Sequence, residues 1–141
     1  MKFSVNQQDL QKSLGYCQGV IEKRSTLPIL SNVLLEINSG HLTITATDLD
    51  LIFIHKISNV EILEEGKTTT SSSIMYDIVR KISSGSKISF SNPSESKLQL
   101  ESEKSIFNLN CISASEFPLT DENFNQNEFS IKSKDLLKLL N

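Results

Sequence analysis

The feature that most limits what this chain can fold into is a pattern that occurs three times, at a spacing of about 60–65 residues. Each copy consists of an extended segment, one or two polar residues and a helix whose apolar residues share one face. Because this spacing is the size of half a compact domain, the pattern predicts one domain of two similar halves, followed by the start of another. The three copies span residues 1–21, 68–82 and 129–140.

Apolar spacing predicts a helix in each of the first two copies, because residues three or four apart share one face of a helix. The two apolar stripes are Leu10, Leu14, Cys17 and Ile21 in a helix over 8–21, and Met75, Ile78, Val79 and Ile82 in a helix over 72–82.

Alternating apolar and polar residues predict three strands after each helix. These strands cover residues 33–37, 41–47 and 51–57 in the first half, and 87–91, 96–101 and 105–111 in the second. Each half is then strand–helix–strand–strand–strand. We expect an α+β fold with both helices on one side and the sheets on the other, the halves being related by a pseudo-twofold axis.

The same pattern predicts where the domains begin and end. The first domain is expected over residues 1–125, with halves of about 1–63 and 66–112 followed by a polar linker. Residues 126–141 begin a second domain, which stops within its first helix.

Composition narrows the cellular setting. The net charge is −3, and two distant cysteines offer neither a disulfide framework nor metal-ligand spacing, which favours the reducing cytoplasm. The amino terminus has no apolar signal-peptide core, and no apolar run approaches the roughly 18 residues that span a bilayer. We therefore expect a cytoplasmic protein that makes no use of a membrane.

Catalytic motifs are scarce. His41 and His55 are isolated within strand patterns, where a partly exposed structural histidine is the usual interpretation. Asp48 and Asp50 form a close acidic pair, which is typical of a turn closed by an aspartate side chain. The alternative is a small metal-dependent enzyme that holds a divalent cation with these two carboxylates.

The predicted polar faces of both helices are lightly basic although the whole chain is acidic. Lys12 lies on the first helix, and Arg80 lies near the end of the second. Lys23 and Arg24 follow the first helix, where cations either complement the helix dipole or contact phosphate. This distribution is the first indication of a polyanionic partner.

Six short segments resemble one known family, the N-terminal domain of the bacterial β sliding clamp. That protein is the processivity subunit of the replicative DNA polymerase III. The resemblance covers essentially the whole chain, in order and without large gaps. The segments are Met1-Lys2-Phe3, Arg24 with Thr26-Leu27-Pro28-Ile29-Leu30, Asn32 with Leu34-Leu35, Thr47-Asp48-Leu49, Tyr76-Asp77-Ile78 with Arg80, and Phe117-Pro118.

The resemblance implies a function without catalysis or cofactors. Clamps of this family are homodimeric rings with three similar domains in each protomer, and their helices line a hole through which duplex DNA passes. It implies that Arg24, Lys12 and Arg80 face DNA. Ser73 stands where many family members carry a basic DNA-contacting residue, so this contact adds no charge here.

The resemblance also implies protein partners. The strand over 105–111 is expected at the edge where one protomer meets the next, with Phe107 and Leu109 at the joint and Lys97 and Lys104 beside it. The polymerase III catalytic subunit and the clamp loader would bind to later domains of the protomer. A free-standing interaction module with the same half-folds and no ring is the alternative.

Overall fold

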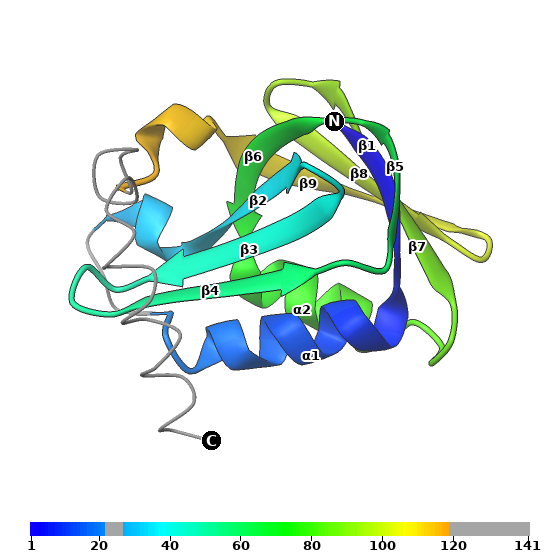
Figure 1. The fold of residues 1–141 in the computed structure, drawn as a ribbon, viewed down its shortest axis with the longest axis horizontal. Helices are drawn as coiled ribbons and strands as arrows, with labels where there is room; N and C mark the ends of the chain where they lie inside the picture. The colour runs from blue at the N-terminus through cyan, green and yellow to red at the C-terminus, as the bar shows by residue number, and fades with distance from the viewer. Residues whose placement is uncertain (22–26, 119–141) are drawn as a thin grey trace.

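The computed structural model describes residues 1–21 and 27–118, in which two α-helices and nine strands form (Figure 1). Its elements are β1 (Lys2–Asn6), α1 (Gln7–Gln18), the 3-10 turn η1 (Pro28–Ser31), β2 (Asn32–Asn38), β3 (His41–Thr47), β4 (Ile52–Ile57), β5 (Val60–Glu64), β6 (Gly66–Ser71), α2 (Ser72–Val79), β7 (Lys87–Ser94), β8 (Lys97–Ser102), β9 (Ser105–Ile112) and the 3-10 turn η2 (Ala114–Glu116). Arg24, the predicted linker beyond residue 118 and the third copy of the pattern lie outside the described residues.

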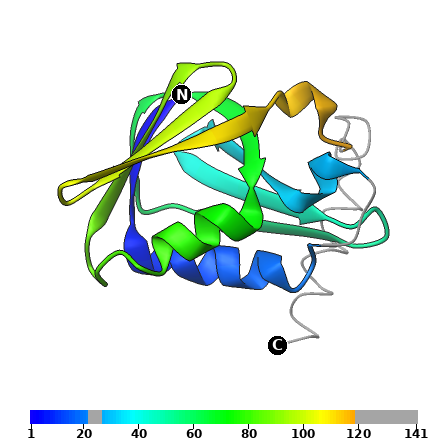
Figure 2. The ribbon, with the colours of Figure 1, turned by 180° about the vertical axis from the view of Figure 1, so that it is seen from behind.

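The strands pair in the order β4-β3-β2-β6-β9-β8-β7-β1-β5, and all the pairings are antiparallel. The two halves exchange their first strands: β6 of the second half pairs with β2, and β1 of the first half pairs with β7. This reciprocal exchange is the arrangement that a pseudo-twofold axis requires. Figures 1 and 2 show both helices side by side beneath the strands, so the predicted α+β fold is confirmed.

Strand β5 is an addition that the sequence pattern does not predict. It follows β4 after only Ser58 and Asn59, yet β4 pairs with β3 whereas β5 pairs with β1. Strand β9 makes the same crossing in one piece, since it pairs with β8 along most of its length and with β6 at Cys111 and Ile112. Together β4 and β5 are therefore the counterpart of β9. Among the described residues, each of these crossing strands has one side without a neighbouring strand along most of its length.

Both helices end three residues before the predicted positions. Helix α1 begins after Asn6, whose side chain accepts a hydrogen bond from the Gln8 N–H at 2.8 Å, and it ends at Gln18 before Gly19. Helix α2 begins after Ser71, whose hydroxyl accepts from the Ile74 N–H. Asparagine and serine are favoured at this position because they satisfy N–H groups that the first helical turn leaves unpaired.

The helices are antiparallel and joined at both ends by buried or partly buried polar side chains. Gln7 at the start of α1 donates through Nε2 to the carbonyl of Val79 at the end of α2, at 2.8 Å. At the other end, the Ser72 hydroxyl donates to Oε1 of Gln18 at 3.2 Å. These bonds give partners to polar groups near the helix ends, where the helix itself leaves backbone groups unpaired.

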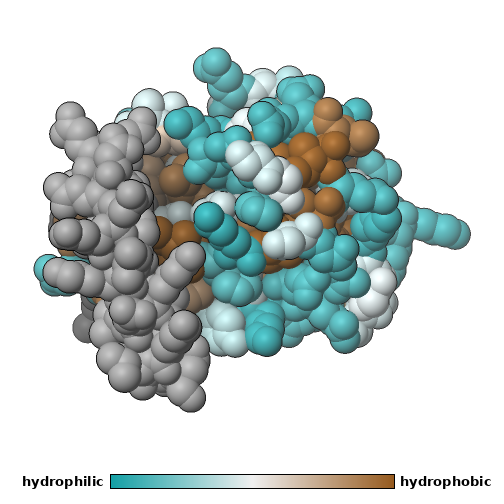
Figure 3. Space-filling model, in the orientation of Figure 1, coloured by the Kyte–Doolittle hydropathy of each residue, from teal (hydrophilic) through white to brown (hydrophobic). Residues whose placement is uncertain are grey.

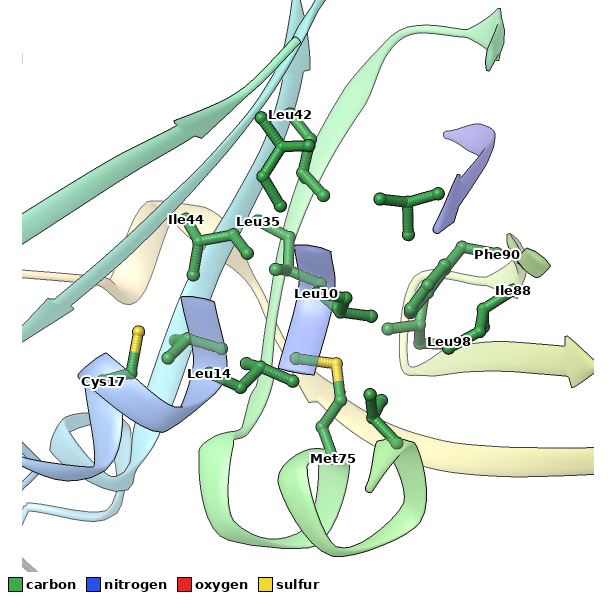
Figure 4. Close-up of a cluster of buried hydrophobic side chains, with 14 of the residues drawn as sticks. Leu10, Leu14, Cys17, Leu35, Leu42, Ile44, Met75, Ile88, Phe90 and Leu98 are labelled. Atoms are coloured by element: carbon green, nitrogen blue, oxygen red, sulfur yellow. The ribbon is translucent and has the colours of Figure 1, made fainter. Parts of the chain in front are cut away.

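The core lies between the helices and the sheets (Figure 4). Leu10 and Leu14 of α1 and Met75 of α2 are fully buried, and they face side chains from strands of both halves. The sheet side chains labelled in Figure 4 are Leu35, Leu42, Ile44, Ile88, Phe90 and Leu98. The predicted apolar stripes thus point into a core that both halves share.

His55 on β4 contacts side chains of α1. Its Nδ1 is hydrogen-bonded to the Ser13 hydroxyl, and its ring stacks on Phe53 and meets the edge of Tyr16. Partial burial lowers the pKa of His55 below its ordinary 6.5, and the positive charge of Lys12 lowers it further, while Asp9 acts in the opposite direction.

Replacing Leu10 by alanine should lower the free energy of unfolding by about 2–5 kcal/mol, because it leaves a cavity where both halves meet. Urea denaturation measures this change. Leu63→Ala is a matched control, since Leu63 is 74% exposed and its truncation should cost less than about 0.5 kcal/mol. Equal losses for both variants would contradict the described core.

Acidification should destabilise the fold through His55. Because its folded pKa is lowered, the unfolded chain binds a proton more readily, so stability falls as pH drops through and below 6.5 and levels off above it. Melting temperatures measured between about pH 8 and about pH 5 should fall more steeply for the unaltered chain than for His55→Gln. Parallel pH profiles would refute this role of His55.

Candidate nucleic-acid interface

The outward faces of the two helices form one polar surface, which we call the helix surface. Figure 3 shows that the molecule is largely hydrophilic over α1, at the lower edge of the view. Both helices turn their apolar stripes to the core, so the side chains opposite those stripes are free of packing. The helix surface comprises Gln8, Lys12, Ser73, Ile74, Asp77, Arg80 and Lys81.

Lys12 is the basic residue that α1 contributes to this surface. With 3.6 residues per turn, it lies about 160° around α1 from both Leu10 and Leu14, so its side chain is directed away from the core. The side chain is exposed, and within the described part of the chain Lys12 forms no ion pair. The structure therefore presents this charge to solvent, as the sequence predicted.

Arg80 is also exposed, but two neighbours hold its guanidinium. Asp77 Oδ1 lies 3.3 Å from Nη2 of Arg80, and the guanidinium carbon lies 5.7 Å from the centre of the Tyr76 ring. Sequence reasoning identified Arg80 but missed both partners, although spacings of three and four residues on a helix indicate such contacts. Ser73 is half-buried in the first turn of α2.

Charge is distributed unevenly between this surface and the rest of the domain. Within residues 7–21 and 72–82 there are three basic side chains, Lys12, Arg80 and Lys81, and two acidic ones, Asp9 and Asp77. The remaining described residues carry six basic and ten acidic side chains. Most of the domain consequently repels a polyanion, and the helices repel it least.

The acidic pair has a structural role. Oδ1 of Asp48 accepts hydrogen bonds from the N–H groups of Asp50 and Leu51, at 2.9 and 2.7 Å, and so closes the turn between β3 and β4. In the described residues no three His, Cys, Asp or Glu side chains come together as a metal site would need. These observations favour the turn interpretation over the metal-dependent enzyme.

A hollow of about 240 Å³ lies on the strands β1, β5, β7 and β8, away from the helices. Its polar lining is three serines with Lys2, Gln99 and Glu101, and it includes no histidine or cysteine. Cys17 does not supply a nucleophile elsewhere, because burial raises the pKa of its thiol to about 12. The lining residues are Lys2, Phe3, Ser4, Leu63, Ser89, Phe90, Ser91, Gln99 and Glu101.

The unpaired side of β9 carries the two apolar residues that are expected at the joint. Phe107 is half-buried against the core, and Leu109 is only 6% exposed, so the side chain of Leu109 belongs to the core. The alternation of this strand turns Leu109 inward, while Ile106 is 56% exposed. Lys97 bonds Oδ1 of Asn110 at 2.5 Å, and Lys104 is exposed in the adjoining turn.

Within residues 1–21 and 27–118, neither helix has the length and apolar character needed to cross a bilayer.

Comparison with known proteins identifies the family. Residues 1–121 match the family described as DNA polymerase III beta subunit, N-terminal domain. The beta sliding clamps of Caulobacter vibrioides and Escherichia coli K12 are each 33% identical to this chain, over 141 and 140 residues. The match covers 99% of this chain and 38% of each relative, so the chain spans a little over a third of their length.

Solved structures show the same fold. The beta sliding clamp of Caulobacter crescentus superposes with a TM-score of 0.80 at 37% identity, covering 85% of this chain and 32% of that one. The sliding clamp of Bartonella birtlesii gives 0.80 at 38% identity, covering 85% and 34%. With the family match over residues 1–121, these likenesses place the chain in the DNA polymerase III beta subunit family, as its N-terminal domain.

Proposed function

We propose that this chain is one segment of a sliding clamp, a ring that encircles duplex DNA and tethers the replicative polymerase. The observation that carries the proposal is the pair of side-by-side helices, whose outward surface is the least acidic part of an acidic domain. Membership of the beta subunit family supports it. The role is one of binding and tethering, without a catalysed reaction or a cofactor.

Sliding limits how strongly such a surface can hold DNA. A ring that moves along the duplex needs a weak, sequence-independent attraction to phosphates, because each tight contact has to break at every step. Lys12 and Arg80 supply such charges from exposed helix positions, and Ser73 offers a hydroxyl without charge. Arg24 is proposed as a further phosphate contact, on the basis of the family resemblance.

The ring requires more than this domain. We propose that residues 126–141 begin a second clamp domain, and that three domains in each of two protomers close the ring. The polymerase III catalytic subunit and the clamp loader then bind to the later domains. DNA replication sets the site of action in the cytoplasm.

The unpaired side of β9 is proposed as the junction with the neighbouring protomer. Exposed Ile106 and half-buried Phe107 supply apolar contact, Leu109 supports the strand from the core, and Lys97 and Lys104 supply charge beside it. An edge strand with an exposed apolar side chain tends to pair with another strand, which supports this assignment.

Removing one cation from the helix surface should weaken DNA binding. Fluorescence anisotropy with a labelled duplex should show that Lys12→Gln and Arg80→Gln each reduce affinity and lower the salt slope by up to about 0.9. Two unrelated DNA sequences should bind equally well. Lys56→Gln removes an exposed cation from β4 and should change affinity less.

An equal loss for all three variants would contradict the assignment of DNA to the helix surface.

Retention on DNA tests the need for further domains, because a single segment cannot enclose a duplex. Nicked circular and linear DNA should release this chain at the same salt concentration. Selective retention on the circle, lost when the circle is cut, would overturn that part of the proposal.

The edge of β9 can be tested by self-association. Light scattering at increasing concentration should give an average mass above the monomer value of 15.8 kDa, because the exposed edge pairs with a second copy. Ile106→Lys should restore the monomer mass. Ile74→Lys is a matched control, since Ile74 is 54% exposed but lies on α2. Loss of association in both variants would argue against the β9 edge.

A further inference from the structure

We propose that Asp77 competes with DNA for Arg80 and thereby limits the affinity of the helix surface. In this arrangement the guanidinium exchanges between the Asp77 carboxylate and a passing phosphate. The inference rests on the proposed function and adds to it a residue that positions a DNA-facing cation and weakens its contact with DNA.

The geometry around Arg80 is that of a held but accessible cation. Asp77 Oδ1 lies 3.3 Å from Nη2 of Arg80, one helical turn earlier. Tyr76 provides a platform, with its ring centre 5.7 Å from the guanidinium carbon. The Tyr76 ring lies beside Gly15 of α1. Asp77 and Tyr76 are therefore the two neighbours that hold the guanidinium of Arg80 on the helix surface.

Exposure shows that this ion pair contributes little to the fold. The side chains of Arg80 and Asp77 are 52% and 56% exposed. Exposed pairs of this kind are weak, because water screens both charges and two long side chains lose freedom. A phosphate can displace the carboxylate at small cost, and the carboxylate can recapture the guanidinium when the phosphate leaves.

The repeat places a cation at the matching position of the other helix. Leu10 corresponds to Met75 and Leu14 to Val79, so Asp77 occupies on α2 the place that Lys12 occupies on α1. Both positions lie about 160° around their helices from the buried side chains. The same outward site thus carries a free cation on one helix and an anion beside a cation on the other.

The decisive experiment measures duplex affinity and its salt dependence for Asp77→Asn by fluorescence anisotropy. The variant should bind about two to five times more tightly, the factor that corresponds to a weak exposed ion pair. Its salt slope should steepen by up to about 0.9, as expected for one further phosphate contact. Asp77→Glu should keep the affinity and salt slope of the unaltered chain, because its carboxylate stays within reach of Arg80.

Two controls separate competition from the mere loss of a negative charge. Asp9→Asn removes one acid from α1 that forms no ion pair with Arg80, and it should tighten binding less. In an Arg80→Gln background, Asp77→Asn should have little further effect. Equal tightening by Asp77→Asn with and without Arg80 would overturn the inference.

Failure of the proposed function would have a different signature. In that case Lys12→Gln and Arg80→Gln would leave DNA affinity unchanged, whatever the effect of Asp77→Asn. Circular dichroism of Asp77→Asn and Asp77→Glu should show unaltered melting, because the replaced side chain is exposed. A large drop in melting temperature would assign Asp77 to the fold and would also refute the inference.

Discussion

Burial of two antiparallel helices against the sheets is the interaction on which the rest of this structure depends. Leu10, Leu14 and Met75 join both halves in one core, and Gln7 links the start of one helix to the end of the other. Because these contacts use one face of each helix, the side chains on the opposite faces do not pack in the core. Their charges can then be set by the partner that they meet.

Sequence patterns predicted the features that depend on periodic burial and missed those that depend on local geometry. The apolar stripes of both helices and the strands β2 and β3 follow from spacing alone. Strand β5 escaped because its apolar face is short: only Val60 and Ile62 pack against the core, and both are only partly buried.

The candidate site divides in the same way. Lys12 and Arg80 were placed on the outward faces from helical periodicity, and the structure exposes both. The inward turn of Leu109 escaped because alternation shows which residues share a face but not which face is buried. The partners of Arg80 escaped because side-chain contacts depend on rotamers as well as spacing.

The crossing strands have a consequence for assembly. Within the described residues, the β4–β5 pair and β9 each leave a row of backbone N–H and C=O groups without a neighbouring strand. The pseudo-twofold axis gives these two rows corresponding positions, so each half of the domain offers one unpaired strand edge. Bivalent units that join edge to edge extend indefinitely unless the angle between successive units brings the chain back on itself. The turn at each junction, rather than the strength of the junction, therefore decides between a fibre and a closed ring.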